Sequence, residues 1–245
     1  MPEILDLREV TERANMGVSR PFICKAGPDN QRYWVKGPGA GWSRDDLCFE
    51  WIAARLAQEL GLPMAEPELI RVPLEFLRYS GVAEIRDLGA GIAYGSRDVF
   101  GSQLLEFNEV TKVPDELQAL IFCFDWWIQN QDRMLGPLGG NVNLLWEPAG
   151  NRLTVIDHNN AFDKDFDDAT HWKNHVFCGI LGGKSELLET VGIKCSKILR
   201  KSAVILAELP DEWTAKDGLP PFDIDHIHST LNRIHKWDSM LQGLP

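Results

Sequence analysis

The chain has 245 residues, of which 44% are hydrophobic and 25% are charged, and these proportions exclude a disordered or a fibrous protein. The 36 acidic residues outnumber the 25 basic ones, and the net charge of −11 disfavours binding to the phosphate backbone of nucleic acids. No segment approaches the roughly 18 apolar residues of a membrane-spanning helix, and charged residues stand where a signal peptide would be apolar. We therefore expect a soluble cytoplasmic protein that binds neither nucleic acid nor a membrane.

The five cysteines are odd in number and widely spaced, and no Cys-x-x-Cys pair occurs among them. This pattern is typical of free thiols in a reducing compartment. It agrees with the expected cytoplasmic location.

Residues 21–36 contain two runs of β-prone residues on either side of a Gly-Pro-Asp-Asn turn, which predicts a β-hairpin. The following residues 37–42, Gly-Pro-Gly-Ala-Gly-Trp, are interpreted as a flexible link. A helix is then predicted from the N-cap residue Ser43 to Gly61, because acidic residues occupy its first turn and a proline lies just beyond its end.

Glu50 lies on a face of this helix where a solvated carboxylate is not expected. The residues three, four and seven positions later are Ala53, Ala54 and Ala57, so the Glu50 side chain points toward packed surface. A carboxylate in such a place needs a cationic or hydrogen-bonding partner. Lys36, at the end of the predicted hairpin, is a cation that could provide it.

The remaining pattern completes an α+β fold class. Trp126 and Trp127 lie in an apolar helix that Pro114 opens, and we expect both to pack in the interior. The other predicted elements are strands over 67–73 and 99–107, a polar loop over 130–140, a hairpin with strands over 141–146 and 152–156, and amphipathic helices over 185–208 and 224–242.

The polar loop and the hairpin after it carry side chains suited to phosphoryl transfer. Asp132 lies in the loop, Asn141 and Asn143 begin the first strand, and Asp157 follows the second strand. A carboxylate can orient and deprotonate a hydroxyl group, while an amide and a second carboxylate can hold a metal ion against phosphate oxygens. Because a hairpin brings both strand ends to one side, these groups are expected to lie together.

The order of these motifs resembles the HipA-like serine/threonine kinase family. Residues 33–36, Tyr-Trp-Val-Lys, are similar to the lysine strand of that family, and Glu50 is similar to the acid of the following helix. Residues 130–133 and the strand from Asn141 look like its catalytic loop, and residues 155–162 look like its metal-binding segment. The resemblance covers residues 17 to 163.

The resemblance implies a two-lobed protein-kinase-like fold, with a β-rich N-terminal lobe over residues 1–105 and a mainly helical C-terminal lobe over residues 106–245. The chain looks like a short form without the N-terminal toxin-type domain of some relatives. The resemblance also implies ATP and Mg²⁺ as cofactors.

Roles are implied residue by residue. Asp132 would be the catalytic base, and Lys36, held by Glu50, would contact the α and β phosphates of ATP. The residues implied in metal binding are Asp157 and Asn143, with Asn141 as the alternative amide, and those implied in nucleotide binding besides Lys36 are Gly17, Ser19 and Glu106.

The expected activity is Mg-dependent phosphorylation of a protein serine or threonine, with the enzyme's own chain as one possible acceptor and an antitoxin-like or regulatory protein as a possible partner. One alternative is a small-molecule or lipid-headgroup kinase on the same fold. Another is a pseudokinase that acts as a binding module. Met134, which replaces a histidine of many relatives, and the lengthened loop over 134–140 motivate the pseudokinase alternative.

His171 and His175 are spaced by four residues, as zinc ligands on a helix can be. The glutamate that would follow the first histidine in a metalloprotease is replaced by Trp172. We therefore interpret both as ordinary histidines on a helix surface.

Overall fold

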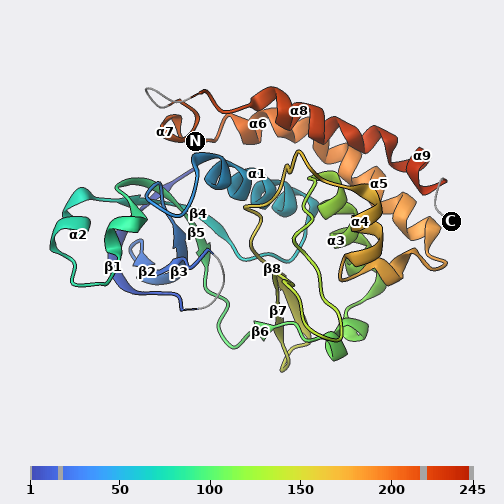
Figure 1. Cartoon of the computed structure of the whole chain (residues 1–245), viewed down its shortest axis with the longest axis horizontal. Coiled ribbons are helices and arrows are strands. Elements are labelled where there is room, and N and C mark those ends of the chain that lie inside the picture. Colours follow the sequence, from blue (N-terminus) through green and yellow to red (C-terminus); the bar gives the residue numbers. More distant parts are fainter. Residues whose placement is uncertain (1, 16–18, 216–219, 243–245) are drawn as a thin grey trace.

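The computed structural model describes residues 2–15, 19–215 and 220–242. Strands dominate the first hundred residues and helices dominate the remainder, as Figure 1 shows. This distribution confirms the predicted α+β class. The division into lobes at residue 105 stays a prediction.

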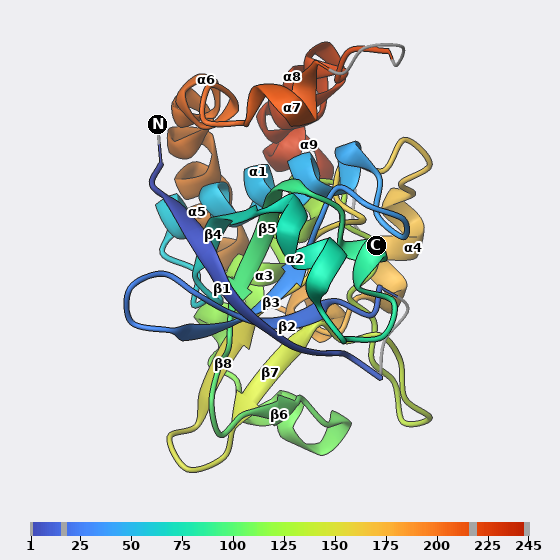
Figure 2. The same cartoon turned by 90° about the vertical axis from the view of Figure 1, so that its left-hand side faces the viewer.

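Five strands near the N-terminus form a closed barrel. Their order is β1-β2-β3-β5-β4, and β1 closes the barrel by pairing in parallel with β4, while the other pairs are antiparallel (Figure 2). The predicted hairpin over 21–36 is confirmed as β2 and β3. The strands are β1 (Ile4–Arg13), β2 (Phe22–Ala26), β3 (Gln31–Lys36), β4 (Pro67–Val72) and β5 (Gly91–Arg97).

β1 was not expected from the sequence. Within it only Leu7 and Val10 are buried, and these residues are three positions apart rather than two or four. Irregularities in the pairing with β2 occur between Leu7 and Glu9 and between Val10 and Glu12. Bulges of this kind interrupt the alternation that marks a half-buried strand.

The strand predicted over 99–107 is largely wrong. Only β6 (Gln103–Leu104) is a strand there, because Gly101 turns the chain with φ 78° and a 3-10 helix, η2 (Phe107–Lys112), follows. The longer strand is β5, in which glycines obscured the pattern. Gly95 packs closely against Ile70, so that a Cβ atom there would lie 2.4 Å from Cδ1 of Ile70 and this side chain would have to shift.

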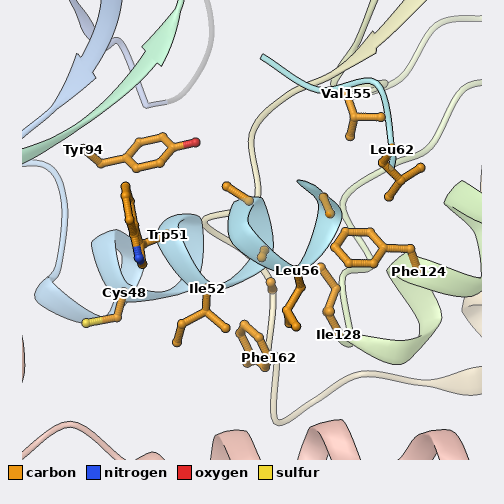
Figure 3. Packing of buried hydrophobic residues seen from close by; sticks show 14 of the residues in the cluster. Cys48, Trp51, Ile52, Leu56, Leu62, Tyr94, Phe124, Ile128, Val155 and Phe162 are labelled. Carbon is orange, nitrogen blue, oxygen red and sulfur yellow. The ribbon is translucent and has the colours of Figure 1, made fainter. Parts of the chain in front are cut away.

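α1 (Arg44–Leu60) joins the barrel to the helical region. Its predicted ends are confirmed: the Ser43 side chain accepts the N–H of Asp46 in a capping box, and Gly61 has the left-handed conformation. One side of α1 contacts β4 and β5, and other sides contact α5, α6 and α7. Figure 3 shows Tyr94 of β5 near Trp51 and, farther along α1, Phe162 near Leu56.

The glycine-rich residues 37–42 do not form the flexible link expected from the sequence. Gly39 donates its N–H to Leu88 O at 3.2 Å, and this backbone packs directly against residues 87–89. A Cβ atom at Gly39 would lie 2.3 Å from Asp87 O and 2.6 Å from Gly89 N. Glycine is therefore needed for the close approach of two backbone segments.

The helical region is built around α3 (Asp115–Trp127), which begins after Pro114 as predicted and buries both Trp126 and Trp127. The predicted hairpin is confirmed as β7 and β8, and β6 adds a third strand to it. The expected helices near 185–208 and 224–242 are also present. The remaining elements are α2 (Leu74–Tyr79), η1 (Ile85–Leu88), β7 (Leu144–Glu147), β8 (Arg152–Val155), α4 (Asp168–Asn174), η3 (Cys178–Leu181), α5 (Ser185–Ile198), η4 (Leu199–Lys201), α6 (Ser202–Leu206), α7 (Asp211–Thr214), α8 (Ile224–Asn232), η5 (Arg233–Lys236) and α9 (Trp237–Leu241).

In the part of the chain that the structure describes, every helix is too short or too polar to cross a membrane.

The packing at Gly39 leads to a first prediction. Gly39→Ala should lower the free energy of unfolding by about 1–3 kcal/mol, because the added methyl group overlaps backbone atoms that cannot rotate away. Thermal unfolding of the purified protein measures the effect. Gly81→Ala is the matched control, since a Cβ atom at Gly81 meets nothing within 4 Å. Equal melting temperatures for the two variants would contradict the packing argument.

Candidate active site

Lys36 is the meeting point of three parts of the chain. Its Nζ donates to Glu50 Oε1 of α1 at 2.5 Å and to Asp157 Oδ1, two residues after β8, at 2.8 Å. The Lys36 and Glu50 side chains are buried, whereas 26% of the Asp157 side chain is exposed. The partner that the sequence predicts for Glu50 is therefore Lys36. Glu50 is also held by the backbone N–H of His158, which donates to Oε2 at 2.9 Å.

The buried cluster keeps Lys36 charged. Burial alone would lower the pKa of Lys36, but the carboxylates of Glu50 and Asp157 outweigh it and raise this pKa above its usual value. Burial raises the pKa of Glu50 to about 7 against the opposing charge of Lys36. Burial also disfavours ionised Asp157, yet Lys36 more than compensates and lowers its pKa. The cluster thus presents a lysine cation and an ionised Asp157 at the edge of solvent.

Asp132 is surrounded by amide groups. Its Oδ2 accepts hydrogen bonds from Nδ2 of Asn141 at 2.7 Å, of Asn160 at 2.8 Å and of Asn143 at 3.3 Å. Among the described residues no donor contacts the other carboxylate oxygen, Oδ1. These three bonds fix the carboxylate and leave one oxygen for a substrate hydroxyl.

The lengthened loop between Asp132 and Asn143 is folded out of the site. Met134 donates its N–H to Asn141 O at 2.8 Å, and Gly136 and Gly139 pair with each other at the tip. Leu138 at this tip is fully exposed. The extra residues therefore form a small hairpin, and both asparagines remain within hydrogen-bond distance of Asp132.

Arg133 fastens the loop to the segments that contain Asn143 and Asp157. It is completely buried, and its guanidinium donates to the backbone carbonyl of Asn143 and, at 3.4 Å, to that of Ile156, the residue before Asp157. Ile156 in turn donates its N–H to Asn143 O at 3.2 Å. One side chain thus sets the spacing between three segments of the site.

Asp125 of α3 neutralises Arg133 inside the protein. Its Oδ2 accepts from Arg133 Nε at 2.6 Å and contacts His175 Nε2 at 2.9 Å, and its Oδ1 accepts from Asn130 Nδ2 at 2.9 Å. Burial opposes ionisation of Asp125, but Arg133 and His175 hold its pKa far below the usual value. A buried ion pair is tolerated only when its remaining polar atoms are also satisfied, as these are.

Two residues of the site adopt the left-handed backbone conformation. Asn143 has φ 45° and Asp157 has φ 58°. Such values are uncommon for residues other than glycine, with asparagine and aspartate the most tolerant. The conformation turns each side chain away from the path of its strand, and such strain recurs at functional sites.

The predicted nucleotide-binding residues are only partly described. Gly17 lies outside the described residues, and Ser19 is half-buried in the connection between β1 and β2. Glu106 is the N-cap of η2, where its carboxylate accepts the N–H of Glu109 and its own N–H donates to the Glu109 side chain. The polar contacts of Glu106 therefore lie within its own turn, and its nucleotide-binding role stays a prediction.

Sequence reasoning missed several residues of the site. Asn160 contacts Asp132, and Asn159 Oδ1 lies 3.5 Å from Lys36 Nζ. Both follow closely after Asp157 in the sequence, and this position could have indicated that they belong to the site. Asp125 gave no such signal, because an acid within an apolar helix is noticed only when its distant partner, Arg133, is known.

His171 and His175 are not on a helix surface as expected. They are 2% and 3% exposed, because α4 packs its histidine side against Phe122 of α3. Burial, together with neighbouring His175, lowers the pKa of His171 to about 3. His175 contacts Asp125 in the interior, and this contact accounts for the burial of the two histidines.

The residues present fit a nucleotide and a divalent cation. Asp157 and Asn143 supply a carboxylate and an amide oxygen, the ligand types that Mg²⁺ prefers, and Lys36 supplies a cation for phosphate. Within the described residues no three His, Cys, Asp or Glu side chains cluster as a metal site.

A known protein family and several solved structures resemble this chain. The family described as HipA-like kinase matches residues 7–239. Among curated proteins no sequence matches.

Solved structures extend the comparison. CtkA, a proinflammatory kinase of Helicobacter pylori, has 12% identity and a TM-score of 0.54 over 90% of this chain and 94% of its own. A Golgi casein kinase has 14% identity and a TM-score of 0.55 over 97% of this chain and 73% of its own. At such identities the likeness concerns the fold, and it confirms the predicted two-lobed protein-kinase-like class.

The buried histidines beside the site predict a dependence of stability on pH. His171 has a pKa of about 3 in the folded protein and a value near 6.5 when unfolded, so below pH 6.5 the unfolded state binds the extra proton. The contribution of His171 to the free energy of unfolding is fully present above pH 6.5. As the pH falls below 6.5, the free energy of unfolding decreases by up to about 1.4 kcal/mol per pH unit. His171→Gln should therefore make stability less sensitive to acid.

Urea unfolding at pH 7 and pH 5 measures this difference. The control is His235→Gln, which changes an exposed histidine of η5. The idea fails if His171→Gln and the wild type lose the same free energy of unfolding between the two pH values.

Proposed function

Because the chain belongs to the HipA-like kinase family, we propose that it transfers the γ-phosphoryl group of ATP, in the presence of Mg²⁺, to a serine or threonine hydroxyl of a protein. The observation that carries this proposal is the contact of Lys36 with both Glu50 and Asp157. This contact joins the barrel, α1 and the segment after β8 at one charged group. Phosphoryl transfer depends mainly on positioning and on charge stabilisation, which this arrangement supplies.

Lys36 binds the phosphates of the nucleotide. Its charge is maintained by two carboxylates, and burial beside them limits its movement. Glu50 is a positioning residue, because its Oε1 holds Lys36 while its Oε2 accepts the N–H of His158. The nucleotide phosphates would then compete with Asp157 for part of the lysine's hydrogen-bonding capacity.

Asp132 orients the acceptor hydroxyl and takes its proton as the new oxygen–phosphorus bond forms and the bond to the ADP oxygen breaks. Its Oδ2 is occupied by three amide donors, so Oδ1 is the oxygen for this step. The three amide groups are neutral, so they hold the Asp132 carboxylate in place and do not take up the proton that Asp132 accepts from the hydroxyl group.

Asn143 and Asp157 would hold the divalent cation. When bound, Mg²⁺ would offset the negative charge that develops on the phosphate oxygens during transfer. Asn143 is favoured over Asn141 because it is buried, is clamped through its carbonyl by Arg133 and lies beside the residue preceding Asp157. Asn141 is exposed. The Golgi casein kinase with Mn/ADP bound supports the use of a nucleotide and a divalent cation on this fold.

The acceptor and the partners are part of the same proposal. A protein substrate, including the chain's own serines and threonines, and an antitoxin-like or regulatory protein follow from the family resemblance. The contacts of Lys36 with Glu50 and Asp157, and of Asp132 with Asn143, favour an active enzyme over a pseudokinase. The outward-folded loop over 134–140 supports this choice, because it leaves Asp132 beside both asparagines.

Substitution of the two acids tests the proposed chemistry. Asp132→Asn should lower phosphate transfer from labelled ATP by about 100-fold to 10,000-fold, because the base is lost. Asp157→Asn should cause a comparable loss by weakening the cation site. The assay follows label incorporated into the protein itself and into a mixed serine and threonine peptide library.

Asp165→Asn is the matched control, since this exposed acid lies eight residues beyond Asp157 and makes none of the contacts described above. Equal turnover in the wild type and all three variants would remove the proposed roles. Transfer of phosphate to small molecules or lipid headgroups, with none to peptides, would change the proposed acceptor and leave the proposed kinase activity in place.

The choice between the two asparagines has its own test. Asn143→Ala should raise the Mg²⁺ concentration required for half-maximal turnover by about tenfold or more, because a ligand is removed. Asn141→Ala should raise it less. The measurement is a titration of Mg²⁺ at saturating ATP, and a larger effect for Asn141→Ala would reverse the assignment.

A further inference from the structure

A polar cavity lies on the helical region, away from Lys36, Asp132 and Asp157. It has a volume of about 710 Å³, and none of those three residues lines it. One wall comes from α8, η5 and α9, the helices drawn in red in Figure 1, and the other comes from the segment that leads into α4. Its lining residues are Trp126, Gln129, Lys164, Asp168, His226, Ser229, Thr230, Arg233, Lys236, Ser239 and Met240.

The charge of this cavity is opposite to that of the chain. The lining has three cations, Lys164, Arg233 and Lys236, and one acid, Asp168, in a protein whose net charge is −11. Lys164 also pairs, at 3.1 Å, with Asp223 outside the lining. Lys236 forms no ion pair with any described residue, and it is exposed. A local excess of cations on an acidic protein is a specific attraction for an anion rather than a general property of the surface.

Arg233 is held in a fixed orientation at the base of the cavity. Its guanidinium lies 4.0 Å from the Trp126 ring centre and 4.9 Å from that of Phe166. It donates to Trp126 O at 3.1 Å and to Asp168 Oδ1 at 2.6 Å. Only 14% of its side chain is exposed, so binding of an anion would not need to order a mobile arginine.

The donors around Arg233 match a phosphate group better than a carboxylate. Lys236 adds a flexible ammonium group, and Lys164, which donates to Asp223 at 3.1 Å, keeps further N–H groups for another acceptor. Ser229 and Ser239 add hydroxyl groups, so several donors can reach separate oxygens of one tetrahedral anion. Asp168 does not block this, because its Oδ1 is already shared by Arg233 and by Nε1 of Trp126 at 2.6 Å. We propose that this cavity binds a phosphomonoester dianion, such as a phosphorylated serine or threonine side chain.

The position of the cavity would couple such binding to the catalytic loop. Gln129 directly precedes residues 130–133, its carbonyl accepts the N–H of Asp163, and its side-chain oxygen accepts from Thr230 at 2.8 Å. Lys164 and Asp168 belong to the segment that follows Asp157. A bound phosphate would therefore connect α8 and α9 with both sides of the reaction centre.

Calorimetry on the full chain, without nucleotide or Mg²⁺, tests the proposal independently of any kinase activity. Three probes are titrated: a phosphoserine pentapeptide, the same peptide with serine, and inorganic phosphate. We expect saturable binding of the phosphopeptide at one site per chain and none of the serine peptide. Inorganic phosphate binding as tightly as the phosphopeptide would identify the phosphate group itself as the whole ligand, whereas weaker binding would point to a polypeptide source.

Substitutions locate the site. Lys236→Glu should weaken binding of the phosphopeptide by about tenfold or more, because an attractive charge becomes repulsive. Lys194→Glu makes the same change at an exposed position of α5 and should leave binding unchanged. Hydrogen exchange of residues 163–168 should slow when the phosphopeptide binds. Absence of saturable binding by any phosphate probe, or equal affinity in Lys236→Glu and the wild type, would overturn the proposal.

Discussion

The buried ion pair between Lys36 and Glu50 is the interaction on which the arrangement of the molecule depends. Two desolvated charges are costly unless they satisfy each other, and removal of either partner would leave an uncompensated charge in the interior. The pair therefore fixes the barrel against α1 at the level of Lys36. Because Glu50 also accepts the N–H of His158, the same requirement fixes the segment after β8. The relative placement of the barrel, α1 and Asp157 thus follows from the satisfaction of one carboxylate.

A second buried pair performs the corresponding task on the helical side. Asp125 and Arg133 are both fully buried, and the arginine uses its remaining N–H groups on the carbonyls of Asn143 and Ile156. Every residue has a main-chain carbonyl. The contacts of Arg133 therefore set the spacing between these segments whatever side chains the segments carry. The two ion pairs together hold the proposed active site at the junction of the barrel and the helical region, and a fixed geometry of this kind is what positioning chemistry requires.

Local signals in the sequence predicted those parts of the fold that are determined locally. Ser43 and Gly61 mark the ends of α1 because capping depends on adjacent residues, and the alanines around Glu50 reveal its buried face through helical periodicity alone. β1 escaped prediction because its bulges depend on the partner strand, and residues 37–42 were misjudged because their tight packing depends on the distant residues 87–89. The roles of Arg133 and Asp125 could not be foreseen for the same reason: a long-range contact determines each one.

The outward-folded hairpin over 134–140 also offers a position for chemical labelling that leaves the site itself untouched. Leu138 at its tip is fully exposed, whereas four of the five cysteines are buried and Cys178 is partly so. Burial raises the pKa values of Cys24, Cys48, Cys123 and Cys178, which keeps these thiols protonated and slow to react. A cysteine at position 138 would accordingly be the fastest to react with a maleimide dye among these thiols. The dye would sit on the loop that carries Asp132, at the end of the hairpin that points away from the site.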